Sequence, residues 1–472
     1  MSGLSQPIQY FQKEPKIYPK RVWGRYRKIK WISMIITLGI YYIAPFIRWD
    51  RGLNAPDQAI LIDMENRRAY FFFIEIWPQE VYYLTGLLIL AAVGLFFITS
   101  LVGRVWCGYL CFQTVWTDLF VWVERLVQGD RNARKKLDES GWTFKKIRQK
   151  VITHAIWLII GLCTGGAWVF YFNDAPTLIE QIIHFDVPWS VLGWIVALTF
   201  TTYIMAGFSR QQVCKYMCPY ARFQSAMFDR DTLIIGYDEQ RGEPRGKFNE
   251  KISKKLGDCI DCSLCVQVCP VGIDIRKGLQ YECITCGLCI DACNNVMDKL
   301  NLPRGLIRYD TPTNQESRQL GHRQKTVWDY ALRIRTFYYI AILTAVSAIM
   351  LYSLAVRSPL DLTILHDRNP LFVKLSDGSI RNGYEIRISN KTHEDRLYRL
   401  EIEGIEVVQS VLKNTHEIDP QNILVFADSI GHFRFFVTAD KQEKPRQSVL
   451  FNVRDTKTGD TIQEKSVFVS AK

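Results

Sequence analysis

The sequence predicts a multi-domain membrane protein, with a five-helix transmembrane region, a cysteine-rich insert and a C-terminal β-sandwich. Three observations predict this fold class: five apolar runs between charged loops, eight of the 13 cysteines between residues 259 and 293, and short alternating apolar stretches after residue 356. The overall composition, 48% hydrophobic and 22% charged, is an average over these contrasting segments. The 13 Trp, 22 Tyr and 26 Phe suit a membrane protein, because aromatic rings gather at the membrane–water interface.

Residues 1–30 form a polar, basic tail without an evident signal-peptide cleavage site. Five runs then approach the ~20 apolar residues needed to cross a bilayer. The predicted transmembrane helices are 31–47, 81–102, 151–172, 189–208 and 336–356. A buried core helix could explain one such run, but five in one chain favour a membrane region. The run 70–77 is too short to cross and is expected at the interface before the second helix.

Loop charges predict the orientation of these helices. The tail and the 103–150 loop are rich in Lys and Arg, the 48–80 loop is net acidic, and the 173–188 loop has no Lys or Arg. Basic loops stay on the cytoplasmic side. We therefore expect the N-terminus and the 209–335 insert in the cytoplasm, and the C-terminal region outside.

The net charge of +12 could also indicate a nucleic-acid partner. However, the basic residues lie in loops beside apolar runs, where they orient helices and contact anionic lipid. No basic stripe with interleaved aromatic residues occurs in a soluble segment. Membrane lipid, and not nucleic acid, is the expected partner of this charge.

The 209–335 insert contains two C-x2-C-x2-C-x3-C runs. The first run is Cys259, Cys262, Cys265 and Cys269, and the second is Cys283, Cys286, Cys289 and Cys293. In runs of this type the fourth cysteine binds the cluster of the other run. The spacing therefore predicts a ferredoxin-like domain with two [4Fe–4S] clusters. One cluster is assigned to Cys259, Cys262, Cys265 and Cys293, and the other to Cys283, Cys286, Cys289 and Cys269.

Zinc sites and disulfides are the alternatives for these cysteines. A zinc ribbon needs only two C-x2-C pairs, and a cytoplasmic location disfavours disulfides. Asn294 stands where a proline would follow the second run, a change that affects a turn preference and not a ligand. No Gly-rich nucleotide fingerprint follows a predicted strand. Electrons must therefore arrive from, and leave to, another site or molecule.

Two C-x3-C pairs lie beside the apolar runs: Cys107 with Cys111, and Cys214 with Cys218. On a helix, this spacing would place both sulfurs of a pair on one face, here at the cytoplasmic membrane surface. A thiolate site favours Cu(I), Zn or an iron–sulfur cluster over hard cations. A redox dithiol and simple packing of small buried residues are the alternatives. Cys163 stands alone in an apolar helix and is expected to pack as a hydrophobic residue.

Polar residues flank both pairs, and two roles are open for them. They are Arg104, Gln113, Asp118, Arg210, Arg222 and Gln224. Anchoring at the membrane interface is the expected role, with redox tuning or quinone contact as the alternative.

Residues 357–472 change in character to short stretches with a period of two, separated by turn residues. These stretches are 383–389, 397–402, 423–426, 432–437 and 449–453. No cysteine follows Cys293, so the region has no disulfide framework. The pattern predicts an immunoglobulin-like antiparallel β-sandwich.

In this combination of motifs the chain resembles the cytochrome c oxidase accessory protein family, known as CcoG, FixG or RdxA. The resemblance covers almost the whole chain. It rests on residues 105–109, 113–118 and 214–224, the two cysteine runs and the β-rich tail. One departure is Phe112, where the family commonly has proline after the second cysteine of the pair, which leaves the local turn open.

The resemblance implies a multi-pass protein of the bacterial inner membrane with a periplasmic C-terminal domain. It implies a cupric reductase that reduces Cu(II) to Cu(I) for assembly of cbb3-type cytochrome c oxidase, with a copper chaperone or oxidase assembly factors as partners. Cys107, Cys111, Cys214 and Cys218 would then handle copper or its electrons. The electron donor stays unnamed. The alternatives are a membrane ferredoxin that relays electrons from quinol to a partner, and a redox-sensing assembly scaffold without turnover.

Overall fold

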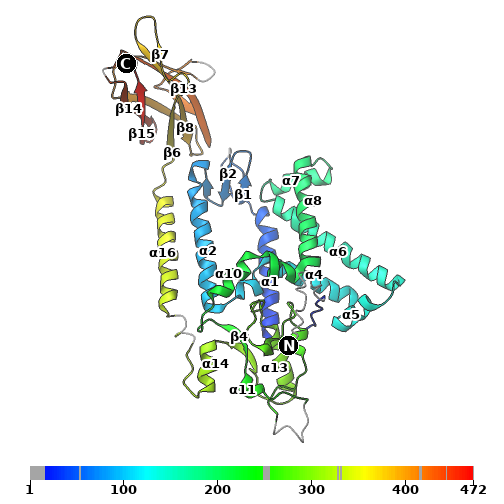
Figure 1. The fold of residues 1–472 in the computed structure, drawn as a ribbon. Helices are drawn as coiled ribbons and strands as arrows, with labels where there is room; N and C mark the ends of the chain where they lie inside the picture. The colour runs from blue at the N-terminus through cyan, green and yellow to red at the C-terminus, as the bar shows by residue number, and fades with distance from the viewer. Residues whose placement is uncertain are drawn as a thin grey trace, which may run out of the picture. The chain divides into compact units, whose positions relative to one another are not determined.

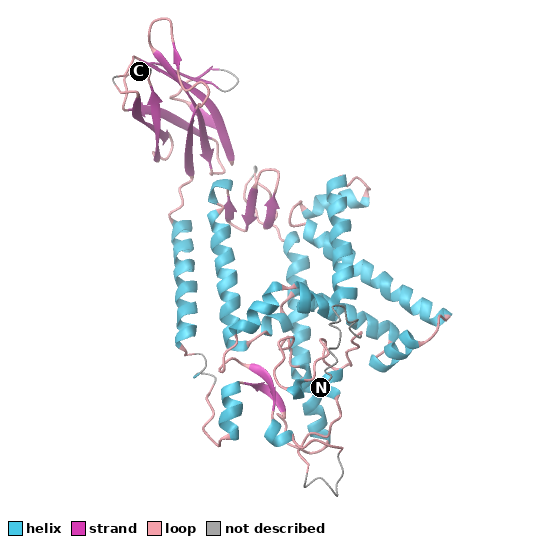
Figure 2. Cartoon of the chain, in the orientation of Figure 1, coloured by secondary structure: helices cyan, strands magenta, loops and turns pink. Residues whose placement is uncertain are grey.

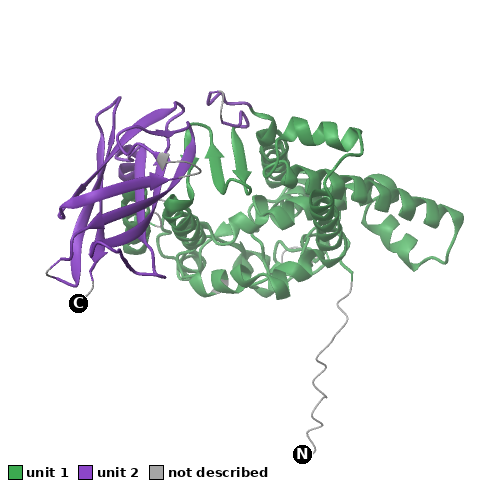
Figure 3. Ribbon diagram, turned by 90° about the horizontal axis from the view of Figure 1, so that it is seen from above, with its two compact units in different colours: residues 1–47, 59–350 green, residues 48–58, 351–472 purple. Residues whose placement is uncertain are grey.

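The computed structural model describes residues 16–52, 55–247, 256–326, 329, 332–413, 417–442 and 444–470. The chain divides into two compact units, residues 1–47 with 59–350 and residues 48–58 with 351–472 (Figure 3). The first unit is mostly helical and contains the cysteine-rich insert, and the second consists mainly of strands (Figure 2).

Among the described residues, five segments are long and apolar enough to cross a membrane, which confirms the predicted five-helix region. They are built on α1 (Arg25–Ile43), α2 (Tyr82–Val102), α6 (Phe144–Val169), α8 (Trp189–Ile204) and α16 (Ile334–Ala355) (Figure 1). α1 is followed by the 3-10 turn η1 (Ala44–Phe46). α8 continues into the π-helical turn η3 (Met205–Ser209), α9 (Arg210–Gln212) and a second π-helical turn, η4 (Val213–Met217).

Two of these helices begin earlier than hydropathy predicts. α1 begins at Arg25 and not at residue 31, because the Asp291 carboxylate accepts hydrogen bonds from the backbone N–H groups of Tyr26 and Arg27, at 3.2 and 2.8 Å. These N–H groups have no partner within their own helix. α6 begins at Phe144 and not at 151, where the Thr143 side chain caps it. Because the first turns of both helices contain charged residues, a search for apolar runs places both helix starts too late in the sequence.

The loops predicted around the second apolar run contain regular structure. β1 (Ile60–Asp63), β2 (Arg68–Phe71) and β3 (Ile74–Ile76) form an antiparallel sheet before the 3-10 turn η2 (Pro78–Glu80). The short run 70–77 therefore includes strand residues of this sheet. The 103–150 loop is helical, with α3 (Val105–Tyr109), α4 (Phe112–Gln128) and α5 (Arg131–Glu139).

The amphipathic helix α4 packs its apolar face against α6 and η3. Phe120 and Val123 of α4 are fully buried against Trp157 of α6 and Ala206 of η3. Two shorter helices complete this region, α7 (Ala175–Ile183) and α10 (Pro219–Met227). α4 thus joins the membrane helices to the segments that carry the cysteine pairs.

Within the insert, the two cysteine runs lie between two paired strands, β4 (Ile234–Tyr237) and β5 (Ile307–Asp310), which run antiparallel. Between them the described residues form four short elements, and a fifth follows β5. They are α11 (Glu239–Gly242), α12 (Leu264–Gln267), the 3-10 turn η6 (Ile275–Lys277) and α13 (Leu288–Lys299), with α14 (Pro312–Gln319) after β5. The cysteines thus lie on loops that a small strand pair closes.

The second unit is a sandwich of two antiparallel sheets, with strand orders β11-β10-β13-β8-β6, with β7 beside β8, and β12-β9-β14-β15. Its core includes Tyr384, Ile386, Phe435 and Phe451, all at most 1% exposed. The strands are β6 (Leu360–His366), β7 (Val373–Lys374), β8 (Ile380–Asn390), β9 (Arg396–Glu403), β10 (Val407–Lys413), β11 (Glu417–Ile418), β12 (Ile423–Val425), β13 (Ser429–Ala439), β14 (Arg446–Asp455) and β15 (Thr461–Val469). Alternate residues of β8 are buried, as the period of two predicts.

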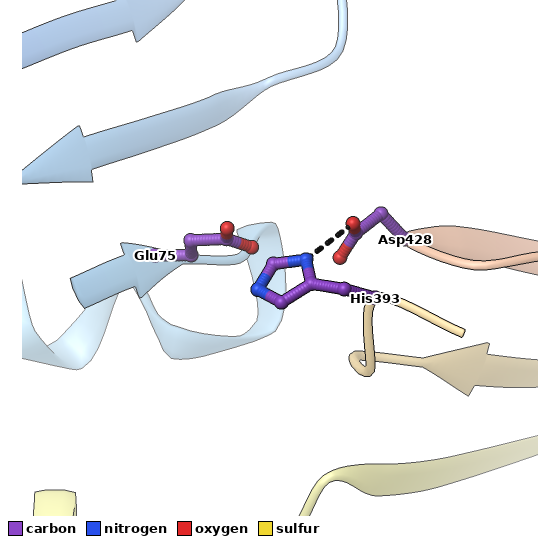
Figure 4. A group of neighbouring side chains, drawn as sticks. All are labelled: Glu75, His393 and Asp428. Carbon is purple, nitrogen blue, oxygen red and sulfur yellow. Dashed lines mark hydrogen bonds and ion pairs between the residues drawn. The ribbon is translucent and has the colours of Figure 1, made fainter. Parts of the chain in front are cut away.

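Two loops of this sandwich are joined by an ion pair. His393 Nδ1 lies 2.7 Å from Asp428 Oδ2, and these residues precede β9 and β13 (Figure 4). Asp428 is buried, so the pair fixes the loops at one end of the sandwich.

Candidate functional site

The two cysteine runs share one unusual backbone shape. Asp261 and Ser263 of the first run have φ values of 52° and 53°, and Thr285 and Gly287, at the equivalent places of the second, have 53° and 73°. Left-handed residues turn successive peptide N–H groups toward one side, which creates a concave site for an anion. Both runs therefore form a loop that wraps around the space between its cysteines.

Four cysteines, which we call the outer set, line one cavity. They are Cys259, Cys262, Cys265 and Cys293. Cys262 is exposed, and Arg276 lines the same cavity while pairing with Asp274 at 2.8 Å. Burial raises the pKa of the Cys265 thiol to about 11, and the Arg276 charge opposes this shift. The outer set thus reaches the surface at one of its members.

None of the remaining four cysteines of the runs, the inner set, is exposed: Cys286 is buried, and the other three are partly buried. The set comprises Cys269, Cys283, Cys286 and Cys289. The Cys289 thiol interacts electrostatically with Cys286, Cys283 and Cys269 of this set and also with Cys265 of the outer set, so the two sets are neighbours. Burial raises the pKa of Cys269 to about 11 and that of Cys283 to about 12. The four cysteines of the outer set thus line one cavity, whereas the assignment of the inner set to the second cluster stays a prediction.

The inner set packs directly against the segment of the first C-x3-C pair. Cys107 shares one buried cluster with Ile284 and Cys286. The Tyr109 hydroxyl donates to the Cys286 carbonyl at 2.8 Å. A Cβ on Gly108 would lie 2.7 Å from the Ile284 carbonyl oxygen, so this approach requires a glycine. α3 is therefore docked on the second run with no space for a side chain between them.

Neither C-x3-C pair lies on one helix, so the prediction of two sulfurs on a single helical face is wrong. Cys107 belongs to α3, but Cys111 is the extended N-cap residue of α4, with φ −62° and ψ 125°. Cys214 belongs to η4, and Cys218 is the extended N-cap residue of α10, with φ −80° and ψ 109°. Both pairs thus straddle a break between helices.

The break also shows the local turn after Cys111, which the sequence left open because Phe112 replaces the proline common in the family. Phe112 begins α4 just as Pro219 begins α10, and the cysteine before each has the same extended backbone. A proline suits the first position of a helix but is not needed there. The two pairs are therefore equivalent in local structure.

The four paired cysteines come together, and we call them the thiol site. Electrostatic interactions link Cys214 to Cys111, Cys107 and Cys218. Burial raises the pKa of the Cys107 thiol, the nearby Arg104 charge opposes it, and Cys111 and Cys218 add to the rise. The thiol site thus combines residues from two segments about a hundred positions apart in sequence.

Most of the flanking polar residues are buried, so the expectation that they anchor the chain at the membrane interface is wrong for them. Arg104, Gln113, Arg210 and Gln224 are at most 8% exposed, whereas Arg222 is exposed. Arg104 Nε donates to Gln224 Oε1 at 2.9 Å, and its guanidinium also donates to the Tyr281 carbonyl. Gln224 Oε1 also accepts from the Cys107 thiol at 3.2 Å.

Two further ion pairs fix α4 beside the thiol site. Arg210 Nη2 lies 2.6 Å from Glu124 Oε1, and Arg27 Nη1 lies 2.7 Å from Asp118 Oδ2. Burial alone would raise the pKa of Asp118, but Lys30 and Arg27 outweigh it and hold this pKa below its ordinary value. Both carboxylates are therefore charged within a shielded environment.

Sequence reasoning missed Gly108, Glu124 and Asp291. Asp291 lies between Cys289 and Cys293 and caps α1, and Glu124 is an acidic residue on the buried face of α4. Glu124 could have been found from the sequence, because it is a charged residue at a position where the helical pattern requires an apolar one. No local signal marks Gly108, since its neighbours are distant in sequence.

Apolar helices beside two loops that gather eight cysteines define a membrane-bound iron–sulfur protein. A 4Fe-4S dicluster domain model matches residues 209–312, a 4Fe-4S binding domain model matches residues 84–130, and a model of the Ig-like fold at the C-terminus of FixG matches residues 350–471. These matches confirm the ferredoxin-like and immunoglobulin-like domains.

Relatives along the whole chain identify the family. Protein RdxB of Cereibacter sphaeroides is 47% identical over 466 residues, covering 97% of both chains. Nitrogen fixation protein FixG of Rhizobium meliloti is 47% identical over 459 residues, covering 91% of this chain and 88% of FixG. RdxA of Cereibacter sphaeroides is 45% identical over 453 residues, covering 96% and 94%. The chain belongs to the FixG/RdxA family, which confirms the resemblance seen in its motifs.

A solved structure, the FixG-related protein from Vibrio parahaemolyticus, matches 25% of this chain and 100% of its own. Its sequence identity is 24% and its TM-score is 0.22, which is too low to support a structural argument.

Proposed function

We propose that this chain transfers single electrons to Cu(II) and releases Cu(I) for the assembly of cbb3-type cytochrome c oxidase. The observation that carries the proposal is one continuous packed path. Cys259 and Cys265 share a buried cluster with Cys289, and Cys289 in turn packs in the cluster that contains Cys107. Each Cu(II) takes up one electron, which a reduced one-electron donor supplies.

The two groups of four cysteines have different surroundings, and we propose different roles for them. The outer set holds one [4Fe–4S] cluster and the inner set holds the other. When bound, the clusters supply one-electron chemistry at two neighbouring centres. Because Cys262 is exposed, the outer set is suited to accept electrons from a donor. The inner set, which has no exposed cysteine, is suited to pass them toward α3.

Arg104 connects the inner set with the thiol site. Its backbone N–H donates to Thr285 Oγ1 at 3.3 Å, and its guanidinium contacts Gln224, the acceptor for Cys107. The same charge opposes the burial that raises the pKa of Cys283. Arg104 therefore favours negative charge on both sides of this contact.

The thiol site is the proposed place of copper reduction. Thiolates bind Cu(I) in preference to hard cations, so sulfur near the copper favours the product of the reduction. Tyr216 and Met217, which lie between Cys214 and Cys218, are exposed.

The same proposal places the chain in the bacterial inner membrane. The basic tail and the basic α5–α6 region support an orientation with the N-terminus and the 209–335 insert in the cytoplasm. Residues 357–472 would then face the periplasm and dock a copper chaperone or an oxidase assembly factor. A C-terminal alkaline phosphatase fusion should be active, and a C-terminal green fluorescent protein fusion dark. The opposite pattern contradicts this orientation.

The reduction itself is tested with purified, anaerobic, chemically reduced full-length protein. Wild type should form Cu(I), measured with a Cu(I)-specific chelator. Cys214→Ser/Cys218→Ser should lose most of this rate while it keeps the inner and outer clusters. Cys163→Ser is the matched control, since Cys163 lies away from the runs in α6. Absence of Cu(II) reduction by wild type would overturn the copper assignment.

One cavity favours a second function, a membrane ferredoxin that takes electrons from quinol. The cavity lies beside Cys214 and is lined by polar and charged residues from several elements. These include Lys30, Gln113, Asp118, Arg125 and Arg210. A quinol headgroup needs hydrogen-bond partners of this kind at a membrane face. Quinol-dependent reduction of the clusters, lost in Gln113→Leu, would support this function, whereas no reduction by quinol would exclude it.

A further inference from the structure

A groove lies between the first turns of α1 and the cysteine-rich insert. α1 packs on α13, and the ring centroids of Tyr26 in α1 and Tyr309 in β5 lie 5.2 Å apart (Figure 1). The groove has a volume of about 920 Å³ and is lined by residues of α1, α13, β5 and the turn before β5. One of these residues, Ile307, also lines the cavity of the outer set. The groove is thus next to the outer set and distinct from the cavity beside Cys214.

One face of α1 changes from charged to apolar along this groove. Four residues of this face line the groove: Arg25, Lys28, Ile29 and Ile32. Their spacing of three, four and seven residues from the first places them on one side of the helix. Ile29 is 41% exposed and Ile32 is 57% exposed, and both basic side chains are exposed as well. The face therefore presents two cations first and two uncovered isoleucines immediately after them.

The positive charge of this face is not neutralised within the groove. The lining contains four cationic side chains and two carboxylates, which leaves a net charge of +2. Both carboxylates are engaged, since Asp298 pairs with Arg304 at 2.6 Å and Asp291 accepts the backbone N–H groups of the first turn of α1. Among the residues that the structure describes, neither Arg25 nor Lys28 has an ion-pair partner. The groove therefore has an excess of positive charge at these two side chains.

The position of α1 relates this groove to the membrane surface. Arg25–Phe46 is one of the segments long and apolar enough to cross a membrane. Basic side chains at the end of such a segment lie at the level of the lipid headgroups, and the apolar residues that follow contact acyl chains. Arg25 and Lys28 begin this segment, and the two isoleucines follow. The groove therefore lies where one leaflet changes from headgroup to hydrocarbon.

An anionic amphiphile matches both halves of the groove. Its phosphate would accept charge-assisted hydrogen bonds from Arg25 and Lys28. Its acyl chain would contact Ile29 and Ile32 within the hydrocarbon layer. A soluble phosphate or nucleotide satisfies the cations but leaves both isoleucines without a contact. The residues of the groove therefore favour a phospholipid over a soluble anion.

We propose that this groove binds one anionic phospholipid, with its phosphate at Arg25 and Lys28 and an acyl chain along the two isoleucines. The bound lipid joins α1 to the insert, because residues of both form its site. Since Ile307 lines both the groove and the outer-set cavity, the lipid holds the insert against the membrane beside the outer set. This site goes beyond the proposed function and does not depend on copper reduction.

Lipid binding is measured by native mass spectrometry of the full-length protein in a neutral detergent. Phosphatidylglycerol and phosphatidylcholine with the same acyl chains are the two probes. Wild type should bind its first phosphatidylglycerol molecule at least ~10-fold more tightly than phosphatidylcholine. Arg25→Gln/Lys28→Gln should weaken phosphatidylglycerol binding about 30-fold, because each cation beside an anionic lipid contributes roughly a factor of five.

Lys145→Gln/Arg148→Gln is the matched control. It removes two exposed charges with the same spacing from the first turns of α6, outside the groove. This variant should bind phosphatidylglycerol as wild type does. Equal losses in the two double variants would show that the lipid follows general surface charge, and they would overturn the proposed site.

Glycerol 3-phosphate distinguishes a phospholipid from a soluble phosphate. It carries the anionic group without acyl chains, so a large excess should leave phosphatidylglycerol bound to wild type. Displacement by this compound, or equal binding of the two lipids by wild type, overturns the proposal even if a variant does not fold. The measurement contains neither copper nor a reductant, so its result and that of the Cu(II) reduction assay are independent.

Discussion

The two cysteine runs have the same spacing but different structural surroundings. After the first run, Pro270 lacks a backbone N–H and disfavours a helical residue before it, and α12 stops at Gln267. After the second run Asn294 permits the helix to continue, and α13 reaches Lys299. This longer helix places Asp291 against the first turn of α1, and Asn295 Nδ2 donates to the Trp23 carbonyl at 2.7 Å.

Cysteine spacing and the residues between the cysteines therefore specify different properties: the first specifies the ligands, and the second specifies the exposure of the site. Spacing selects the ligands, and it is equal in the two runs. The intervening residues differ, and so does the exposure of the two runs. The first run exposes Cys262, whereas Gly108 and Tyr109 of α3 cover the second. In the proposed function, the exposed centre would exchange electrons with a partner, and the covered one would pass them within the chain.

The largest effect is expected from removing one ligand in each set. Cys286→Ser should reduce donor-driven Cu(II) reduction at least ~10-fold, because a shielded one-electron carrier is lost. Cys262→Ser removes the exposed ligand, and chemically reduced protein should retain more activity than Cys286→Ser. Steady-state Cu(I) formation measures the activity of both variants, and electron paramagnetic resonance (EPR) identifies the cluster that remains in each. Equal losses would mean that the two sets do not differ in role.

The next largest effect is expected at the ion pair between Arg27 of α1 and Asp118 of α4. The backbone N–H of Arg27 donates to Asp291 of the second run, so this ion pair links that run to α4. Asp118→Asn leaves Arg27 and Lys30 buried beside a neutral group, and should cost about 3–5 kcal/mol of unfolding free energy. Asp274→Asn, beside the outer set, should cost less, because Arg276 keeps its contact with Asp261. Thermal unfolding in detergent measures both variants. A larger loss of stability for Asp274→Asn than for Asp118→Asn would contradict the greater structural role assigned to the Asp118 ion pair.

The same ion pair has a defined pH dependence. The pKa of Asp118 is lower in the folded chain than its ordinary value, so the stabilisation is fully present above an unfolded pKa of about 4. It is lost as pH falls through the lower folded pKa. The difference in unfolding temperature between wild type and Asp118→Asn should be constant from pH 7 to about pH 5 and shrink below about pH 4. A difference that shrinks already near pH 6 would show that another group titrates.

A smaller effect is expected from filling the contact between α3 and the second run. Gly108→Ala places a Cβ against the Ile284 carbonyl and should destabilise the chain by about 1–3 kcal/mol. Gly94→Ala is the control, because nothing lies within 4 Å of its Cβ. The inner-set EPR signal should broaden in Gly108→Ala only. An unchanged spectrum and stability would show that α3 is not tightly docked.

The smallest effect is expected from uncapping α1. Asp291→Asn weakens the hydrogen bonds to Tyr26 and Arg27 and should cost about 1 kcal/mol. Asp298→Asn, on the same helix, removes only a surface ion pair with Arg304 and should change stability much less. Chemical unfolding followed by circular dichroism compares the two. Equal effects would indicate that Asp291 has no capping role.

The sequence predicted the features that depend on local spacing. The five apolar runs, the two sets of four cysteines and the alternation in the sandwich all repeat over a few residues, so each is readable without tertiary information. The start of α1 was missed because Arg27 and Lys30 count as polar in a hydropathy profile, although Asp118 neutralises them in the fold. The start of α6 was missed because Lys145, Lys146 and Arg148 lie in its first turns.

Features that depend on distant contacts were not predictable in this way. The C-x3-C pairs fit a continuous helix by spacing, yet both break at the second cysteine. Arg104 and Gln224 are ordinary interface residues by sequence, and contacts with distant segments, including their mutual contact, explain their burial. The docking of Gly108 on Ile284 joins segments that no local pattern connects.

The direction of electron flow is tested most directly by freeze-quench EPR of fully reduced wild-type protein mixed with Cu(II). Spectra of Cys262→Ser and Cys286→Ser identify the outer-set and inner-set signals. If the thiol site is where electrons leave, the inner-set signal is oxidised first and the outer-set signal follows. Oxidation of the outer set first, through the exposed Cys262, would contradict this direction.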